Sequence, residues 1–261
     1  MYIKTSEGNI YFEDHGSEKK PVLVFTHGAG LNCRMFDSQI EPLQKDYRLV
    51  LWDMPGHGQS GRLTRALDFS RQSAHIMAIL DELGVKQAVL GGHSLGSWVS
   101  QHGAIKYPER VQALFSLGGT PLHRPLGRLY ILSFQASNLL FRLLPTKPIF
   151  RLAANQKAVT EEAQLFYFNS LMELGSQQVF YINQGMAAGG NVKLPAPSQP
   201  LLITHGELES PKLTITMNQK WHYETPGSKY VILPGAGHNC NQDNPAAFNQ
   251  VLLDFLRGID L

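Results

Sequence analysis

Cysteine is scarce in this sequence, and neither its cysteines nor its histidines form a metal-binding pattern. Cys33 and Cys240 are the only cysteines among 261 residues, too few for a disulfide framework, and we interpret both as small packing residues. The ten histidines are scattered without an HExxH pattern, and no CxxC pair is present. The sequence therefore predicts no bound metal ion and no other cofactor.

A strong charge of either sign and a long apolar run are also missing. The 23 basic and 21 acidic side chains leave a formal net charge of +2, and no run of Lys and Arg forms a basic cluster of the kind that binds nucleic acid. The first eight residues lack the apolar stretch that a secretory signal needs. The apolar stretch from Leu129 to Leu144 is too short and too polar for a membrane-spanning helix of roughly 20 apolar residues. We expect a cytoplasmic protein, without integral membrane association, that acts on a small molecule; the sequence does not indicate its oligomeric state.

Short β-rich runs alternate with helical patterns, which is typical of an α/β protein whose mostly parallel sheet has helices on both faces. Strands are predicted at residues 9–13, 21–26, 47–52, 87–91, 111–117, 201–204 and 229–233. Helices are predicted directly after Ser94, ending before Pro108, and from Pro245 to Arg257. Between residues 120 and 195 helical periodicity continues without a convincing strand. We therefore predict an α/β core at 1–119 and 196–261, interrupted by a helical lid at 120–195.

The strongest chemical signal is the pentapeptide Gly92-His93-Ser94-Leu95-Gly96. It follows a predicted strand and precedes a predicted helix, the context that a G-x-S-x-G nucleophile elbow requires. In such a turn the serine adopts a strained backbone conformation, and the helix N-terminus lies beneath the negative charge that develops in the reaction. We predict that Ser94 is a catalytic nucleophile.

A serine hydroxyl needs a base, and His238 is the best candidate. It lies in the glycine-rich GAGHN segment at 235–239, between the last predicted strand and the last predicted helix. The acid that orients this histidine should follow another strand, and the segment HGELE at 205–209 offers two glutamates there. We favour Glu209 over Glu207; a solvated acidic loop is the alternative interpretation of both.

The predicted oxyanion hole consists of the backbone N–H groups of Ala29 and Leu95. Ala29 belongs to the HGAG segment at 27–30, which follows a predicted strand, and Leu95 directly follows the nucleophile.

Apolar side chains near the start of the predicted lid exceed the stripe that one buried helix face requires, so part of them should line a pocket over Ser94. We expect Phe134 and Phe141, together with Trp98, to contact a largely apolar substrate there. Ordinary packing within the lid is the alternative.

Together these motifs resemble the α/β-hydrolase superfamily, and within it the capped branch of esterases, haloperoxidase-like enzymes and C–C hydrolases. The matching segments are HGAG at 27–30, DMPGHGQS at 53–60, GHSLG at 92–96, HGELE at 205–209 and GAGHN at 235–239. The resemblance implies the α/β-hydrolase fold, and it implies no catalytic role for Asp53 or His57. The family's acid usually stands in Gly-Glu-x-Asp, and the matching position here is Glu209, one methylene longer.

The residue at the nucleophile position also selects a reaction class within this superfamily. Haloalkane dehalogenases and epoxide hydrolases of this fold carry an aspartate there, so Ser94 argues against both activities. The resemblance implies hydrolysis of a carboxylic ester, thioester or lactone through an acyl-enzyme. C–C bond hydrolysis by the same three residues, and a slow-turnover ligand receptor on the same fold, are the alternatives.

Overall fold

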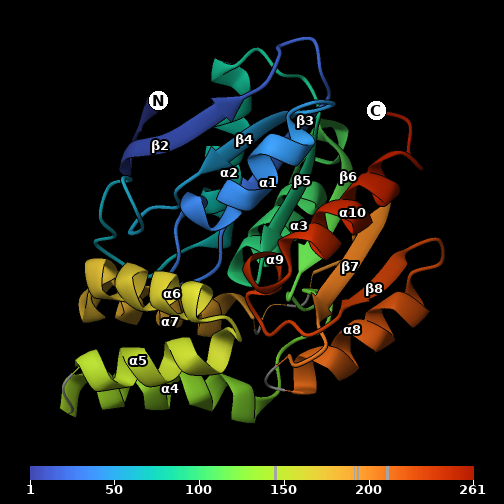
Figure 1. Cartoon of the computed structure of the whole chain (residues 1–261). Coiled ribbons are helices and arrows are strands. Elements are labelled where there is room, and N and C mark those ends of the chain that lie inside the picture. Colours follow the sequence, from blue (N-terminus) through green and yellow to red (C-terminus); the bar gives the residue numbers. More distant parts are fainter. Residues whose placement is uncertain (144–145, 191, 193, 210–211) are drawn as a thin grey trace.

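A mixed eight-stranded sheet forms the centre of the molecule (Figure 1). The computed structural model describes residues 1–143, 146–190, 192, 194–209 and 212–261, and the side chains of residues 129–130 and 140–143 lie outside this description. The strand order is β1-β2-β4-β3-β5-β6-β7-β8. The antiparallel part pairs β1 (Tyr2–Thr5) with β2 (Gly8–His15), and β2 with β4 (Arg48–Trp52). From β4 the sheet continues in parallel through β3 (Val22–Thr26), β5 (Ala88–His93), β6 (Val111–Leu117), β7 (Leu201–Gly206) and β8 (Lys229–Leu233).

The predicted α/β class is confirmed, and the central strands are mostly apolar and buried because helices cover both faces of the sheet. Every residue of β3 and β4 is buried. Successive side chains of a strand point to opposite faces, so Val22 and Val24 join one core while Leu23 and Phe25 join the other. Continuous apolar runs, without polar alternation, are therefore the correct signature of these strands.

Five longer helices cover the sheet in the described part of the chain. The core on one face includes residues of α2 (Phe69–Glu82), α3 (Leu95–Lys106) and α8 (Lys212–Glu224). On the other face lie α1 (Asp37–Leu43) and α10 (Pro245–Leu256), which Figure 1 shows in front of the strands. Three short helices occupy connections: η1 (Cys33–Phe36), η2 (Pro108–Arg110) and α9 (Cys240–Asp243).

Between β6 and β7 the described residues form four helices and no strand. These are α4 (Arg128–Leu143), α5 (Thr146–Lys157), α6 (Glu161–Leu174) and α7 (Ser176–Gly189), called the cap helices below. α4 packs on α7 and α5 on α6, and Figure 1 shows all four gathered at one end of the sheet. Across the described ranges, no helix has both the length and the apolar character needed to cross a bilayer.

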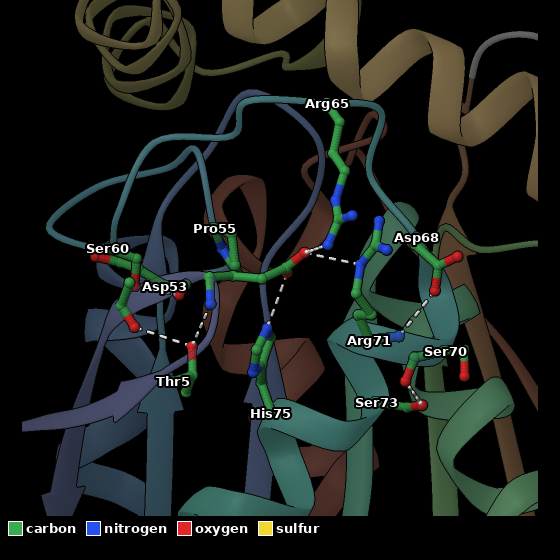
Figure 2. Close-up of polar contacts among 12 residues, drawn as sticks. Thr5, Asp53, Pro55, Ser60, Arg65, Asp68, Ser70, Arg71, Ser73 and His75 are labelled. Atoms are coloured by element: carbon green, nitrogen blue, oxygen red, sulfur yellow. Dashed lines mark hydrogen bonds and ion pairs between the residues drawn. The ribbon is translucent and has the colours of Figure 1, made fainter.

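The first strand, β1, was not among the predicted strands, and its position depends on the turn that joins it to β2. Glu7 in that turn is the centre of an ion-pair cluster with Arg65, Arg71 and His75, drawn in Figure 2. Its carboxylate contacts Arg71 Nε at 2.7 Å and His75 Nε2 at 3.1 Å, both on α2. Because these partners are distant in sequence, local periodicity carries no sign of the cluster that holds this hairpin against α2.

Candidate active site

Ser94 lies at the sharp turn between the end of β5 and the start of α3. Its backbone φ of 51° and ψ of −111° make it the one non-glycine residue with positive φ among those described. These angles are energetically unfavourable for a residue with a Cβ atom, and backbone strain of this kind is found most often at functional sites. The Ser94 N–H donates to the carbonyl of Leu117 at 2.8 Å, which ties the turn to the end of β6.

The two glycines of the pentapeptide are required by close backbone packing. A Cβ on Gly92 would lie 2.5 Å from the carbonyl oxygen of Thr26, and a Cβ on Gly96 would clash with the same atom. The end of β3 therefore presses directly against the elbow, and any side chain at either position would force the two apart.

The structure brings the carboxylate of Glu209, and not that of Glu207, to the imidazole of His238. Glu209 lies after β7 with a fully enclosed side chain, and its Oε1 accepts a hydrogen bond from Nδ1–H of His238 at 2.8 Å. Glu207 is exposed, and its Oε2 accepts from the N–H of Gly235 at 2.9 Å. The extra methylene of a glutamate is thus accommodated, and the two carboxylates have separate partners.

His238 is neutral at neutral pH, because burial and then the positive charge of Lys157 lower its pKa well below the ordinary value. With the proton on Nδ1 shared with Glu209, the other ring nitrogen is left as an acceptor. A hydrogen bond from His93 fixes the loop that carries the His238 imidazole: Nε2–H of His93 donates to the backbone carbonyl of His238 at 2.9 Å. This arrangement has the protonation state that a general base requires.

The loop containing Ala29 is braced by two buried histidines that act as structural acceptors. His57 Nε2 accepts from the N–H of Gly30 at 3.2 Å, and His27 Nε2 accepts from the N–H of Met54 at 3.0 Å. Burial lowers the pKa of His27 to about 4 and that of His57 to about 3, so both remain neutral and able to accept. His57 therefore supports the backbone of this loop.

Two N–H groups near Ser94 are available to a substrate oxygen. Within the described chain, no group accepts a hydrogen bond from the N–H of Ala29 or of Leu95. Leu95 is the first residue of α3, where a backbone N–H has no partner inside the helix, and Ala29 lines the same cavity as Ser94.

A cavity of about 150 Å³ joins Ser94 and His238 to the cap helices, and a second cavity of about 380 Å³ adjoins it. Phe134 lines both cavities, whereas the side chain of Phe141 lies outside the described part of the chain. The larger cavity is lined mainly by cap residues, with an apolar wall made of Phe150, Leu171, Leu174, Val179 and Ile182.

Trp98 is placed elsewhere. It is buried against Phe69 of α2, and its indole N–H donates to the carbonyl of Thr120 at 3.0 Å. It lines neither of the two cavities in the described part of the chain, so the structure does not bring it to the site with Phe134.

Sequence reasoning missed three cap residues that line both cavities: Lys157, Tyr167 and Asn183. Nothing in their surroundings distinguishes them in the sequence, because the direction in which a cap helix faces depends on its packing against the other helices. Both cysteines are buried, and the described residues contain no group of three or more His, Cys, Asp or Glu side chains suited to a metal ion.

Comparison with known proteins gives relatives of the same fold. The chain is 27% identical over 249 residues to the dihydrolipoyllysine-residue acetyltransferase component of an acetoin cleaving system of Pseudomonas putida, covering 93% of this chain and 65% of that protein's length. It is 27% identical over 253 residues to a pimeloyl-[acyl-carrier protein] methyl ester esterase of Yersinia enterocolitica, covering 89% and 92% of the two chains. A solved thermophilic esterase from Thermogutta terrifontis superposes with a TM-score of 0.84 at 23% identity, covering 99% and 98%.

A family model described as alpha/beta hydrolase fold matches residues 21–245, a range that contains the elbow, both glutamates and His238. This match covers most of the chain, and the topology, the strained serine and the similar proteins agree with it. The protein belongs to the α/β-hydrolase fold family.

Proposed function

We propose that this hydrolase cleaves an ester-like bond, in a carboxylic ester, thioester or lactone, through an acyl-enzyme on Ser94. One observation carries the proposal: the strained Ser94 shares a small cavity with a neutral His238 whose Nδ1–H is bound by the enclosed carboxylate of Glu209. A hydroxyl, a base with a free acceptor nitrogen and an acid that fixes the tautomer are the parts that acyl transfer needs.

In the proposed mechanism, Oγ of Ser94 attacks the substrate carbonyl while Nε2 of His238 takes its proton. Glu209 stabilises the imidazolium that forms, and the N–H groups of Ala29 and Leu95 bind the oxyanion of the tetrahedral intermediate. The imidazolium then protonates the leaving oxygen or sulfur as its bond to the acyl carbon breaks; an alcohol or thiol departs, whereas the hydroxyl of an opened lactone stays on the acyl group. A water molecule, deprotonated by His238, then attacks the acyl carbon, and the imidazolium returns this proton to Oγ of Ser94 as the acyl–oxygen bond breaks and the acid is released.

We also propose that residues 120–195 act as a lid that selects the acyl group. The apolar wall of the larger cavity belongs to the cap helices and adjoins the cavity of Ser94, which supports a small, largely apolar substrate. The name of the Yersinia relative, a methyl ester esterase, agrees with ester chemistry.

The test uses p-nitrophenyl butyrate as substrate and compares the wild type with Ser94→Ala. We expect a loss on the order of 10⁵ to 10⁶ in kcat, because without the nucleophile the remaining groups cannot form the acyl-enzyme. Ser97→Ala, which removes a hydroxyl of the same helix that contacts Ser116, is the matched control and should stay close to wild type.

A phosphonate probe followed by mass spectrometry of peptides identifies the nucleophile independently. An adduct on Ser94 supports the mechanism, and an adduct on another residue contradicts it. An adduct without turnover of any ester would favour the slow-turnover receptor, and turnover of a 2-hydroxy-6-oxo-dienoate in preference to esters would favour C–C hydrolysis.

A further inference from the structure

The two cavities beside Ser94 share one formally charged side chain, Lys157. Among the described residues that line either cavity, it is the one lysine or arginine, and the Glu209 carboxylate acts on its charge from outside that lining. Its neighbours there are apolar or uncharged polar groups such as Phe134, Tyr167 and Asn183. A cationic group is therefore built into a cavity that otherwise suits an apolar substrate.

The main chain of Lys157 is fixed against the loop of the catalytic histidine. Lys157 is the last residue of α5, and its carbonyl accepts a hydrogen bond from the N–H of Asn239 at 2.9 Å, directly after His238. Two residues later, the N–H of Val159 donates to the carboxylate of Asp243 at 3.0 Å. The end of α5 is thus anchored beside the site, where Lys157 lines both cavities.

The position of this lysine has an electrostatic cost for the proposed reaction. Burial lowers the pKa of the Lys157 amine, an effect that the Glu209 carboxylate opposes, and the lysine's charge lowers the pKa of His238. His238 must become an imidazolium during acylation, and a nearby cation disfavours that state. A negative charge on the bound substrate would offset this repulsion and would pair with the ammonium group.

We propose that the preferred substrate is an ester or lactone whose acyl portion carries a carboxylate, and that Lys157 binds this carboxylate while the apolar cap wall holds the intervening methylene groups. This inference rests on the proposed hydrolase function. Lys157 is then a specificity-determining residue that acts on one class of substrate and leaves the hydrolysis of neutral esters to the other groups of the site.

The test compares two p-nitrophenyl esters of similar shape, the monoester of adipate and the heptanoate, after subtraction of spontaneous hydrolysis. Lys157→Met should lower kcat/KM for the adipate monoester about tenfold or more, mainly through KM, since a charge-assisted hydrogen bond is lost. Turnover of the heptanoate should not fall by a comparable factor, because loss of the cation beside His238 favours formation of the imidazolium, and urea unfolding establishes that the variant is folded. Lys157→Arg should retain the preference for adipate in part, and Lys147→Met, at an exposed position of α5, should change neither rate.

Equal losses on both esters would overturn the inference, because they would assign Lys157 to the support of His238 and Glu209 in general. An unchanged adipate rate would overturn it as well. A binding measurement separates this inference from the proposed function: monomethyl adipate should bind Ser94→Ala at least about tenfold more tightly than Ser94→Ala/Lys157→Met by calorimetry. Equal binding by these two variants contradicts the role of Lys157, whereas ester turnover that survives in Ser94→Ala contradicts the proposed function.

Discussion

The carboxylate of Glu209 can be tested sharply, because a second glutamate two residues away provides the control. The replacement Glu209→Gln keeps the shape and an acceptor for Nδ1–H of His238, 2.8 Å away, and removes the charge that would stabilise the imidazolium. At about 4 Å between charge centres and an effective dielectric constant of about 20, that attraction is about 4 kcal/mol. A difference of this size in the transition state corresponds to roughly a thousandfold in rate.

We therefore expect kcat/KM for p-nitrophenyl butyrate to fall about a thousandfold in Glu209→Gln. Glu207→Gln should stay within about threefold of wild type, since an exposed carboxylate contributes little to the site. Active-site titration with a phosphonate and urea unfolding establish that equal amounts of folded enzyme are compared. A larger loss in Glu207→Gln would show that the acid is misassigned, and near-wild-type rates in both variants would show that His238 works without a charged partner.

Much of the fold could be predicted from the sequence because its central strands are apolar on both faces and end at recognisable turns. Lys229–Leu233 and Val111–Leu117 were predicted to the residue, and β5 extends two residues beyond its predicted end, to His93. The motif around Ser94 was readable because a strained turn needs glycines at fixed positions next to a strand and a helix. A feature that depends on neighbouring residues, such as this turn, can therefore be recognised from a short stretch of sequence.

Properties that depend on how helices face one another could not be predicted. Trp98 lies four residues after Ser94 on α3, a helix with nine buried residues out of twelve, so its periodicity does not reveal which side faces the cavity. The indole ring of Trp98 packs against Phe69 of α2 and does not face the cavity. Lys157 was missed for a related reason: it lines the cavity because the end of a cap helix meets a loop about 80 residues further along the chain.

Two further predictions concern stability. Because the pKa values of His27 and His57, about 4 and about 3, are depressed below the unfolded value of about 6.5, the unfolded state binds more protons as pH falls, and stability decreases. Urea unfolding should show a loss of about 1.3 kcal/mol for each of these histidines between pH 7 and pH 5.5, and a pH-independent free energy of unfolding would contradict their burial as neutral groups. Asp243 connects the cap helices to the loop of His238, because its two carboxylate oxygens accept from the N–H of Gly237 at 2.9 Å and from backbone N–H groups just before α6. An asparagine there must turn an NH₂ group toward at least one of these donors, so Asp243→Asn should lower the free energy of unfolding by about 2 kcal/mol and lower kcat, since the next residue after Gly237 is the proposed base. Asp254→Asn, an exposed carboxylate on α10, should change neither quantity, and equal behaviour of the two variants would show that the cap is not tied to the site through Asp243.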